Sequence, residues 1–193
     1  MCHSRQANFA LTMNEGQLNR GEQLLQWERL GFFRVDSVAF ERDRLGREKS
    51  PPLFAQATDQ REPRTATLLP RGSERLGHFA TASDEHATLE KRARSYLATN
   101  CAHCHTLYGG GNSAIDFDWL FPLAETHAIG ERPVHGDFGL ADARIISPGA
   151  PERSILLLRV STRGSGQMPP VCTHAPDPDG IRLLTEWIQS MPR

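Results

Sequence analysis

The pentapeptide Cys101-Ala102-His103-Cys104-His105 decides how the rest of this 193-residue chain is interpreted. It has the order C-x-x-C-H, in which two thiols separated by two residues are followed at once by an imidazole. The two thiols can bond to the two vinyl groups of a porphyrin, and the adjacent histidine then reaches the iron from the same face. The pattern is typical of covalent attachment of a c-type haem. It predicts Cys101 and Cys104 as the attachment points and His105 as the proximal iron ligand.

Two other uses of a C-x-x-C pair stay open. A structural zinc site usually needs a second pair of ligands, but the remaining cysteines, Cys2 and Cys172, are single and remote in the sequence. A thioredoxin-like dithiol lies at the start of a helix that follows a strand. Here helix-like sequence precedes the motif and the glycine run 109–111 follows it. The sequence therefore favours haem over zinc or dithiol chemistry.

A second iron ligand is predicted in the segment 164–170, which reads GSGQMPP. Flexible glycines before Met168 and stiff prolines after it would fix one thioether in space, and thioether sulfur is a soft ligand suited to haem iron. Met168 lies 63 residues after His105, far enough to reach the opposite face of the ring. The alternative for Met168 is a core methionine. His127, His135 and His174 are the fallback sixth ligands, whereas His103 is expected to point away.

Hydrophobic spacing predicts an all-α fold in which helices close on the motif. A helix is expected from an N-cap at Ser83 into the motif, and another runs from Pro151 to Val160. The stretch from Asp177 to Met191 has a strong apolar stripe and is the expected partner of the first helix, so the two should cross. The irregular, aromatic segment 114–140 would form an apolar wall for the ring. Upstream, only one short helix is expected, from about Gly21 to Leu30.

The composition suits a water-soluble protein with a modest core, since 38% of residues are hydrophobic and 23% are charged. The formal net charge is -1, so nothing indicates a nucleic-acid surface. The longest apolar run, Ile155 to Leu158, is four residues, against about 20 for a membrane-spanning helix. No membrane span is therefore predicted.

Two regions are expected, an N-terminal extension at 1–82 and a haem domain at 83–193. Within the first, prolines and charged residues between Arg42 and Arg75 leave few apolar anchors and predict an extended linker. The first residues lack the apolar core of a secretory signal, although haem c is attached outside the bacterial cytoplasm. Met1-Cys2-His3 would be the remnant of a C-x-M-C-H motif. We therefore expect a truncated chain that has lost a signal peptide and half of a first haem motif.

The order of the C-x-x-C-H motif, Met168-Pro169-Pro170 and a closing helix with Glu186-Trp187-Ile188 resembles a class I cytochrome c domain. More narrowly, the segment 92–105, with Pro148-Gly149 and Ser154, resembles the C-terminal part of bacterial diheme c-type cytochromes associated with quinoprotein dehydrogenase-like proteins. Cys2-His3 followed by 17–20 (QLNR) is similar to the region after that family's first haem motif. The resemblance covers both ends of the chain, but the first cysteine of the first motif is missing.

These observations together predict one covalent haem c in this chain, with His105 and Met168 as axial ligands, and one-electron transfer as the function. A filled sixth position argues against catalysis at the iron, so an electron carrier is favoured over an enzyme. The alternatives are a peroxidase-type enzyme with an open sixth position and a zinc-stabilised interaction module. Methionine ligation raises the reduction potential, which suits an acceptor of electrons from a dehydrogenase or a donor to a terminal oxidase. Because haem c is attached outside the bacterial cytoplasm, a periplasmic or otherwise exported location is expected.

Overall fold

The computed structural model describes residues 15–36, 65–67 and 76–193. The chain divides into two compact units. One holds the described residues up to His78, and the other begins at Phe79 and contains the C-x-x-C-H motif. Each unit is described by itself. Three expectations fall outside the described residues. They are the remnant motif Cys2-His3, the N-terminal truncation and most of the linker.

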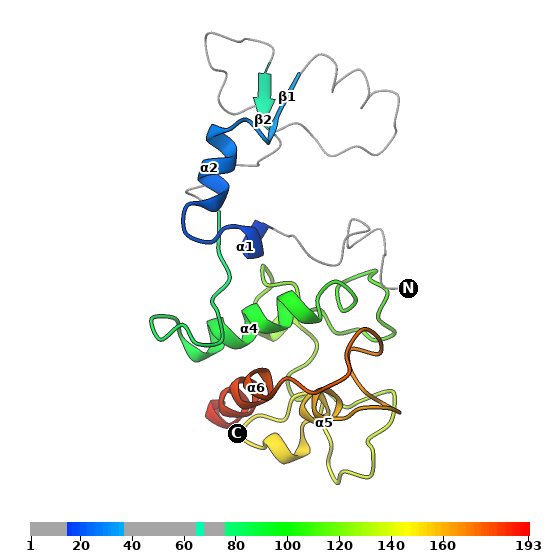
Figure 1. Cartoon of the computed structure of the whole chain (residues 1–193). Helices are drawn as coiled ribbons and strands as arrows, with labels where there is room; N and C mark the ends of the chain where they lie inside the picture. The colour runs from blue at the N-terminus through cyan, green and yellow to red at the C-terminus, as the bar shows by residue number, and fades with distance from the viewer. Residues whose placement is uncertain (1–14, 37–64, 68–75) are drawn as a thin grey trace. The chain divides into compact units, whose positions relative to one another are not determined.

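The unit that begins at Phe79 is helical, as the sequence predicts, and two of its helices form most of its core. Helix α4 spans Leu89–Asn100 and helix α6 spans Pro178–Ser190. They pack against each other, with α4 in green and α6 in red in Figure 1. Burial of apolar side chains supplies most of the driving force for such packing. The buried residues are Ala93, Leu97 and Ala98 from α4 and Leu183, Leu184, Trp187 and Ile188 from α6.

The start of α4 differs from the prediction. The N-cap is Thr88, whose hydroxyl accepts a hydrogen bond from the Lys91 N–H at 3.2 Å. The predicted cap, Ser83, lies in the preceding turn, where its hydroxyl contacts that of Thr81. Both residues suit a cap, but Leu89 is the first residue of the apolar stripe that packs on the core. Packing of that stripe therefore places the N-cap five residues after Ser83.

Helix α6 begins as predicted, at the N-cap Asp177. The Asp177 carboxylate accepts from the N–H groups of Asp179 and Gly180, at 3.1 and 3.2 Å. Gly180 is required where α6 meets α4, because an added Cβ would lie 2.3 Å from the Tyr96 hydroxyl oxygen. The predicted helix from Pro151 is split into a 3-10 turn, Pro151–Arg153, and helix α5, Ile155–Ser161. Helix α5 packs against α6.

The segment 114–140 is irregular, as predicted, with one 3-10 turn at Leu123–Glu125. Its aromatic residues do not share one environment. Phe117 is buried in the core, whereas Phe121 and Phe138 are exposed. Trp119 packs edge-on against Phe79, with ring centroids 5.3 Å apart. The use of this segment as an apolar wall for the ring stays a prediction.

The N-terminal unit has more regular structure than the sequence predicts. Helix α2, Gln23–Arg29, corresponds to the predicted short helix, but helix α1, Glu15–Leu18, precedes it. Strands β1, Arg34–Asp36, and β2, Thr65–Thr67, pair antiparallel with Val35 opposite Ala66. Strands of three residues carry almost no period-two signal, so hydrophobic alternation could not reveal them. A small cluster forms its core, with buried Leu24 and Leu76 and half-buried Leu18, Trp27 and Phe33.

Among the described residues, no helix is both long enough and apolar enough to span a bilayer.

Candidate functional site

The C-x-x-C-H motif begins where α4 ends. Cys101 is the C-cap of the helix, and its N–H donates to the Leu97 carbonyl at 2.8 Å. The Cys101 carbonyl then accepts from the N–H groups of Cys104 and His105, at 3.1 and 2.8 Å. These bonds continue the chain as one more tight turn. The two thiols and the imidazole are therefore held on a single rigid turn anchored to the core helix.

Neither motif cysteine is in a disulfide, and the surroundings of Cys101 keep its thiol protonated. Burial, and next the nearby Cys104 thiol, raise the pKa of Cys101 to about 12. Reactive dithiols have the opposite property, since a lowered thiol pKa supplies the attacking thiolate at neutral pH. The motif also follows a helix instead of opening one. Both observations disfavour a thioredoxin-like function.

The imidazole of His105 is half-buried and oriented by two neighbours. Its Nδ1 lies 3.0 Å from the Ser113 hydroxyl oxygen. The ring meets that of Phe117 edge-on, with centroids 6.1 Å apart, while the Phe117 N–H donates to the His105 carbonyl. Burial first, and then the charges of His103 and Arg159, lower the pKa of His105. The imidazole is therefore favoured in its neutral form, which is the form that binds a metal.

The loop after the motif folds back over His105. The Gly111 N–H donates to the Cys104 carbonyl at 2.7 Å. An added Cβ at Gly111 would lie 2.7 Å from that carbonyl oxygen and 2.9 Å from His105 Nδ1. Only glycine allows the backbone to approach so closely. The glycine run that the sequence predicts as a sharp turn thus forms a close-fitting wall on the Nδ1 side of His105.

A buried carboxylate holds the base of this loop. Asp116 is only 6% exposed. Its Oδ2 accepts from the Leu107 N–H at 2.9 Å, and its Oδ1 accepts from the Asp118 N–H at 2.8 Å. The Thr106 hydroxyl donates to the same carboxylate at 3.4 Å. Asp116 is not among the predicted site residues. Its position between the apolar residues Ile115 and Phe117 is the sequence feature that indicates a buried acid.

A cavity of about 520 Å³ lies beside the loop. Its lining consists of residues from Thr106 to Ile115, together with Val134 and His135. Ser113, the partner of His105 Nδ1, is among them. None of the four predicted site residues lines it. The cavity is therefore not formed by the predicted ligands.

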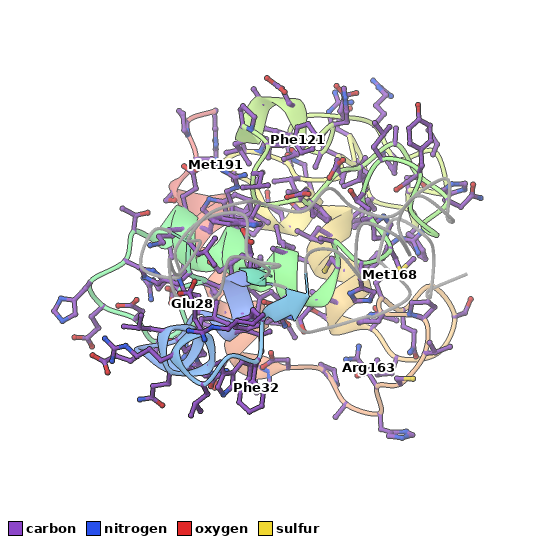
Figure 2. All side chains as sticks on the ribbon, turned by 90° about the horizontal axis from the view of Figure 1, so that it is seen from above. Glu28, Phe32, Phe121, Arg163, Met168 and Met191 are labelled. Carbon is purple, nitrogen blue, oxygen red and sulfur yellow. The ribbon has the colours of Figure 1, made fainter. Side chains whose placement is uncertain are left out.

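Met168 lies on the connection that follows α5 and is half-buried. Its N–H donates to the carbonyl of Arg159 at 2.9 Å, which ties the loop back to the last turn of α5. Figure 2 shows Met168 and Arg163 on this connection, with Met191 well apart from them. The charge of Arg159 also contributes to lowering the pKa of His105. The structure thus brings the base of the Met168 loop into the neighbourhood of the motif.

The other histidines are less suitable as iron ligands than Met168. His127, His135 and His174 are exposed. The Nε2 of His135 is already engaged by the carbonyl of Asn112. In the described part of the chain, no group of three or more His, Cys, Asp or Glu side chains is arranged to hold a metal ion. That leaves the zinc alternative without a ligand set among these residues.

The donor set at the motif fits a covalent haem. Two unbridged thiols lie on one turn, and the neutral imidazole next to them has its Nδ1 occupied by Ser113, so Nε2 is the nitrogen left for iron. Cys101, Cys104 and His105 would hold the group from one side, and Met168 would supply the thioether. Comparisons with protein-family models, with curated proteins and with solved structures found no match to this chain.

Proposed function

We propose that this chain is an electron-transfer protein that carries one covalently attached c-type haem. The observation that carries the proposal is the turn at the end of α4, which presents the Cys101 and Cys104 thiols with an imidazole whose Nδ1 is already bonded to Ser113. A metal-binding histidine commonly donates its second ring N–H in this way, because the bond fixes the tautomer and the ring orientation. Bound haem would supply a one-electron couple between ferric and ferrous iron.

Each of the chain's own residues then has a defined task. Cys101 and Cys104 would anchor the group, and His105 would bind the iron through Nε2. Met168 would be the second iron ligand from the protein, and a thioether raises the reduction potential relative to a second imidazole. With both side chains on the iron, no coordination site would be open to a substrate. The proposal is therefore an electron carrier and not a catalyst at the iron.

A cytochrome c-like arrangement of the helical unit is part of the proposal. The packing of α4 against α6 supports it, because the helix that ends in the motif is held by the last helix of the chain. The junction is specific, since Tyr96 of α4 occupies the space left by the missing side chain of Gly180 in α6. This packing would keep the turn 101–105 in one orientation relative to the core.

Attachment outside the cytoplasm is also proposed, with a dehydrogenase or a terminal oxidase as the redox partner. The support is chemical, since haem c is attached to C-x-x-C-H segments in the periplasm of bacteria. The resemblance to diheme cytochromes associated with quinoprotein dehydrogenase-like proteins supports a dehydrogenase as the electron donor.

The proposal is tested by measuring whether haem stays covalently bound to the denatured chain. The protein is produced with an export signal in a host that attaches haem c, and a pyridine haemochrome spectrum is recorded after denaturation and gel separation. Wild-type protein and a Cys172→Ser control should retain haem on the polypeptide. The double variant Cys101→Ser/Cys104→Ser should release it. Haem that stays covalently bound in the double variant, or is absent from the wild type, contradicts the proposal.

A second measurement separates the carrier from a peroxidase. Thioether ligation of ferric iron gives a weak absorption band near the red end of the visible spectrum, and the Met168→Ala variant should lose it. The wild-type protein should turn over peroxide slowly and Met168→Ala faster, because the variant opens an axial position. Rapid peroxide turnover by the wild type without that band would identify an enzyme instead.

A further inference from the structure

One arginine side chain connects the Met168 loop to the rest of the helical unit. Arg159 lies in the last turn of α5. Its Nη1 donates to the Gly166 carbonyl at 3.1 Å, and its Nη2 donates to the His135 carbonyl at 3.0 Å. Its own carbonyl accepts the Met168 N–H at 2.9 Å. Arg159 thus contacts the loop on both sides of Gln167, once through its side chain and once through its backbone.

An aromatic ring covers the same guanidinium. The Arg159 Cζ lies 4.6 Å from the centroid of the Phe138 ring, a cation–π geometry. The ring also packs on the loop, since an added Cβ at Gly166 would lie 2.5 Å from it. Phe138 has a positive φ of 55°, a conformation that is strained for a bulky residue. Strain of this kind persists only where the surroundings hold the residue in place.

The network continues to the loop behind His105. His135, whose carbonyl accepts from Arg159, is bonded through its Nε2 to the Asn112 carbonyl. Asn112 is next to Ser113, the partner of His105 Nδ1. Hydrogen bonds, together with the chain between Asn112 and Ser113, therefore join the loop that carries Met168 to the loop that orients His105, and Arg159 bonds to both sides.

We propose that Arg159 is the positioning residue for the Met168 thioether, fixing the loop 164–168 against the loop that orients His105. This inference rests on the proposed function, because it assigns Met168 to the iron. The planar guanidinium is suited to the task. It donates to two carbonyls in fixed directions while stacking on a ring, which a lysine ammonium cannot do. In this proposal Arg159 does not touch the iron and acts by positioning Met168.

Competition by imidazole for the sixth position tests the proposal on the full, haem-loaded chain. Imidazole is titrated into the ferric protein while the thioether band is followed, and circular dichroism verifies the fold of each variant. In Arg159→Gln, the imidazole concentration at half-saturation should fall about tenfold, the effect of losing one charge-assisted hydrogen bond. Arg159→Lys keeps the positive charge but loses the planar group that donates to two carbonyls at once. In this variant the imidazole concentration at half-saturation should fall about threefold.

The matched control is Arg182→Gln on α6. The Arg182 side chain is 68% exposed and pairs with Asp179 on the surface, so half-saturation should match the wild type. Should Arg159→Gln not fold, Phe138→Leu removes the ring and leaves both hydrogen bonds, with an expected fall of about threefold. The proposal is overturned if the folded Arg159 variants reach half-saturation at an imidazole concentration within twofold of the wild-type value. If Arg159→Gln does not fold, the same result in Phe138→Leu overturns it.

The same experiment distinguishes the possible failures. Absence of covalent haem from the wild type defeats the proposed function and this inference together. Covalent haem without the thioether band defeats the assignment of Met168 and therefore the role of Arg159, but leaves the attachment site intact. Covalent haem with the band, and unchanged imidazole competition in the variants, defeats the role of Arg159 alone.

Discussion

The hydroxyl oxygen of Ser113 lies 3.0 Å from Nδ1 of His105, eight residues earlier in the chain. The glycine-rich loop between them makes this contact possible, because the Gly111 backbone passes directly over the histidine ring. Nothing in the sequence pattern marks Ser113, which is one small polar residue in a small-residue loop. The imidazole is therefore oriented from outside the motif as well as from within it.

Removing this contact should shift the reduction potential. With Nε2 on the iron, Nδ1 carries the hydrogen and donates to Ser113, which makes the ligand more basic and favours ferric iron. Ser113→Ala should raise the potential by roughly 30 mV, since a net hydrogen bond contributes about 0.5–1.5 kcal/mol and about 59 mV corresponds to a tenfold change for one electron. Spectroelectrochemical titration measures it. Ser113→Thr keeps the hydroxyl and should stay near the wild-type value, whereas a lower potential in Ser113→Ala would contradict this account.

Adding one methyl group at Gly111 should destabilise the helical unit. The new Cβ would lie 2.7 Å from the Cys104 carbonyl oxygen, which is backbone and cannot rotate away. Gly111→Ala should lower the free energy of unfolding by about 3 kcal/mol, the upper range for overpacking. Gly139→Ala is the control, since Gly139 has a positive φ but open space around its Cα, and should cost about 1–2 kcal/mol. Chemical denaturation followed by circular dichroism compares the two. Equal losses would show that the close approach to Cys104 is not important.

The buried carboxylate of Asp116 should be a strong contributor to stability. Asp116→Ala leaves the N–H groups of Leu107 and Asp118 without their acceptor, which should cost about 2–3 kcal/mol. Asp116→Asn keeps one acceptor oxygen and should lose about half as much. The surface variant Glu186→Ala should remain within about 0.5 kcal/mol of wild type. The same denaturation assay applies, and a loss below about 1 kcal/mol for Asp116→Ala would contradict the role assigned to this residue.

Tyr96 should make the fold sensitive to alkali. Burial, and then the charge and hydrogen bond of Asp177, raise the pKa of Tyr96 above its ordinary value of 10.0. The folded chain keeps this proton at a pH where the unfolded chain loses it, so the free energy of unfolding should fall as the pH rises above about 10. Below that pH the contribution is fully present. Tyr96→Phe should reduce the slope of this alkaline loss.

Unfolding midpoints in denaturant between pH 8 and 11 provide the measurement for Tyr96. The chain has two tyrosines, and the second, Tyr108, is 81% exposed, so Tyr108→Phe is a matched control that should leave the alkaline loss as in the wild type. At neutral pH, Tyr96→Phe should cost about 1 kcal/mol for the lost hydrogen bond. A Tyr96→Phe variant with the wild-type pH slope would exclude this explanation.

The sequence predicted the strongly periodic parts of the fold and missed the parts that depend on contacts. The stretch from Asp177 to Met191 was recognisable as a helix because its apolar residues recur with a helical period. The start of α4 was misplaced at Ser83, since the choice between two good caps depends on which turn packs on the core. The pairing of Arg34–Asp36 with Thr65–Thr67 joins residues about thirty apart in three-residue strands, and no local pattern encodes it.

The residues of the candidate site also include some that the sequence predicts and some that only the structure reveals. Cys101, Cys104, His105 and Met168 could be predicted as site residues because their residue types and spacing carry chemistry. Ser113 and Arg159 could not, because their roles come from where the backbone places a carbonyl or a ring. A serine and an arginine are common surface residues, and only the geometry distinguishes these two.

The junction of α4 and α6 has a consequence for the order of events during synthesis. The turn 101–105 leaves the ribosome about eighty residues before Trp187 and Ile188, which complete the core around α4. Until α6 has been made, Tyr96 and the rest of α4 lack the helix against which they pack. The turn that carries both thiols is therefore complete before the helix that holds it in place exists.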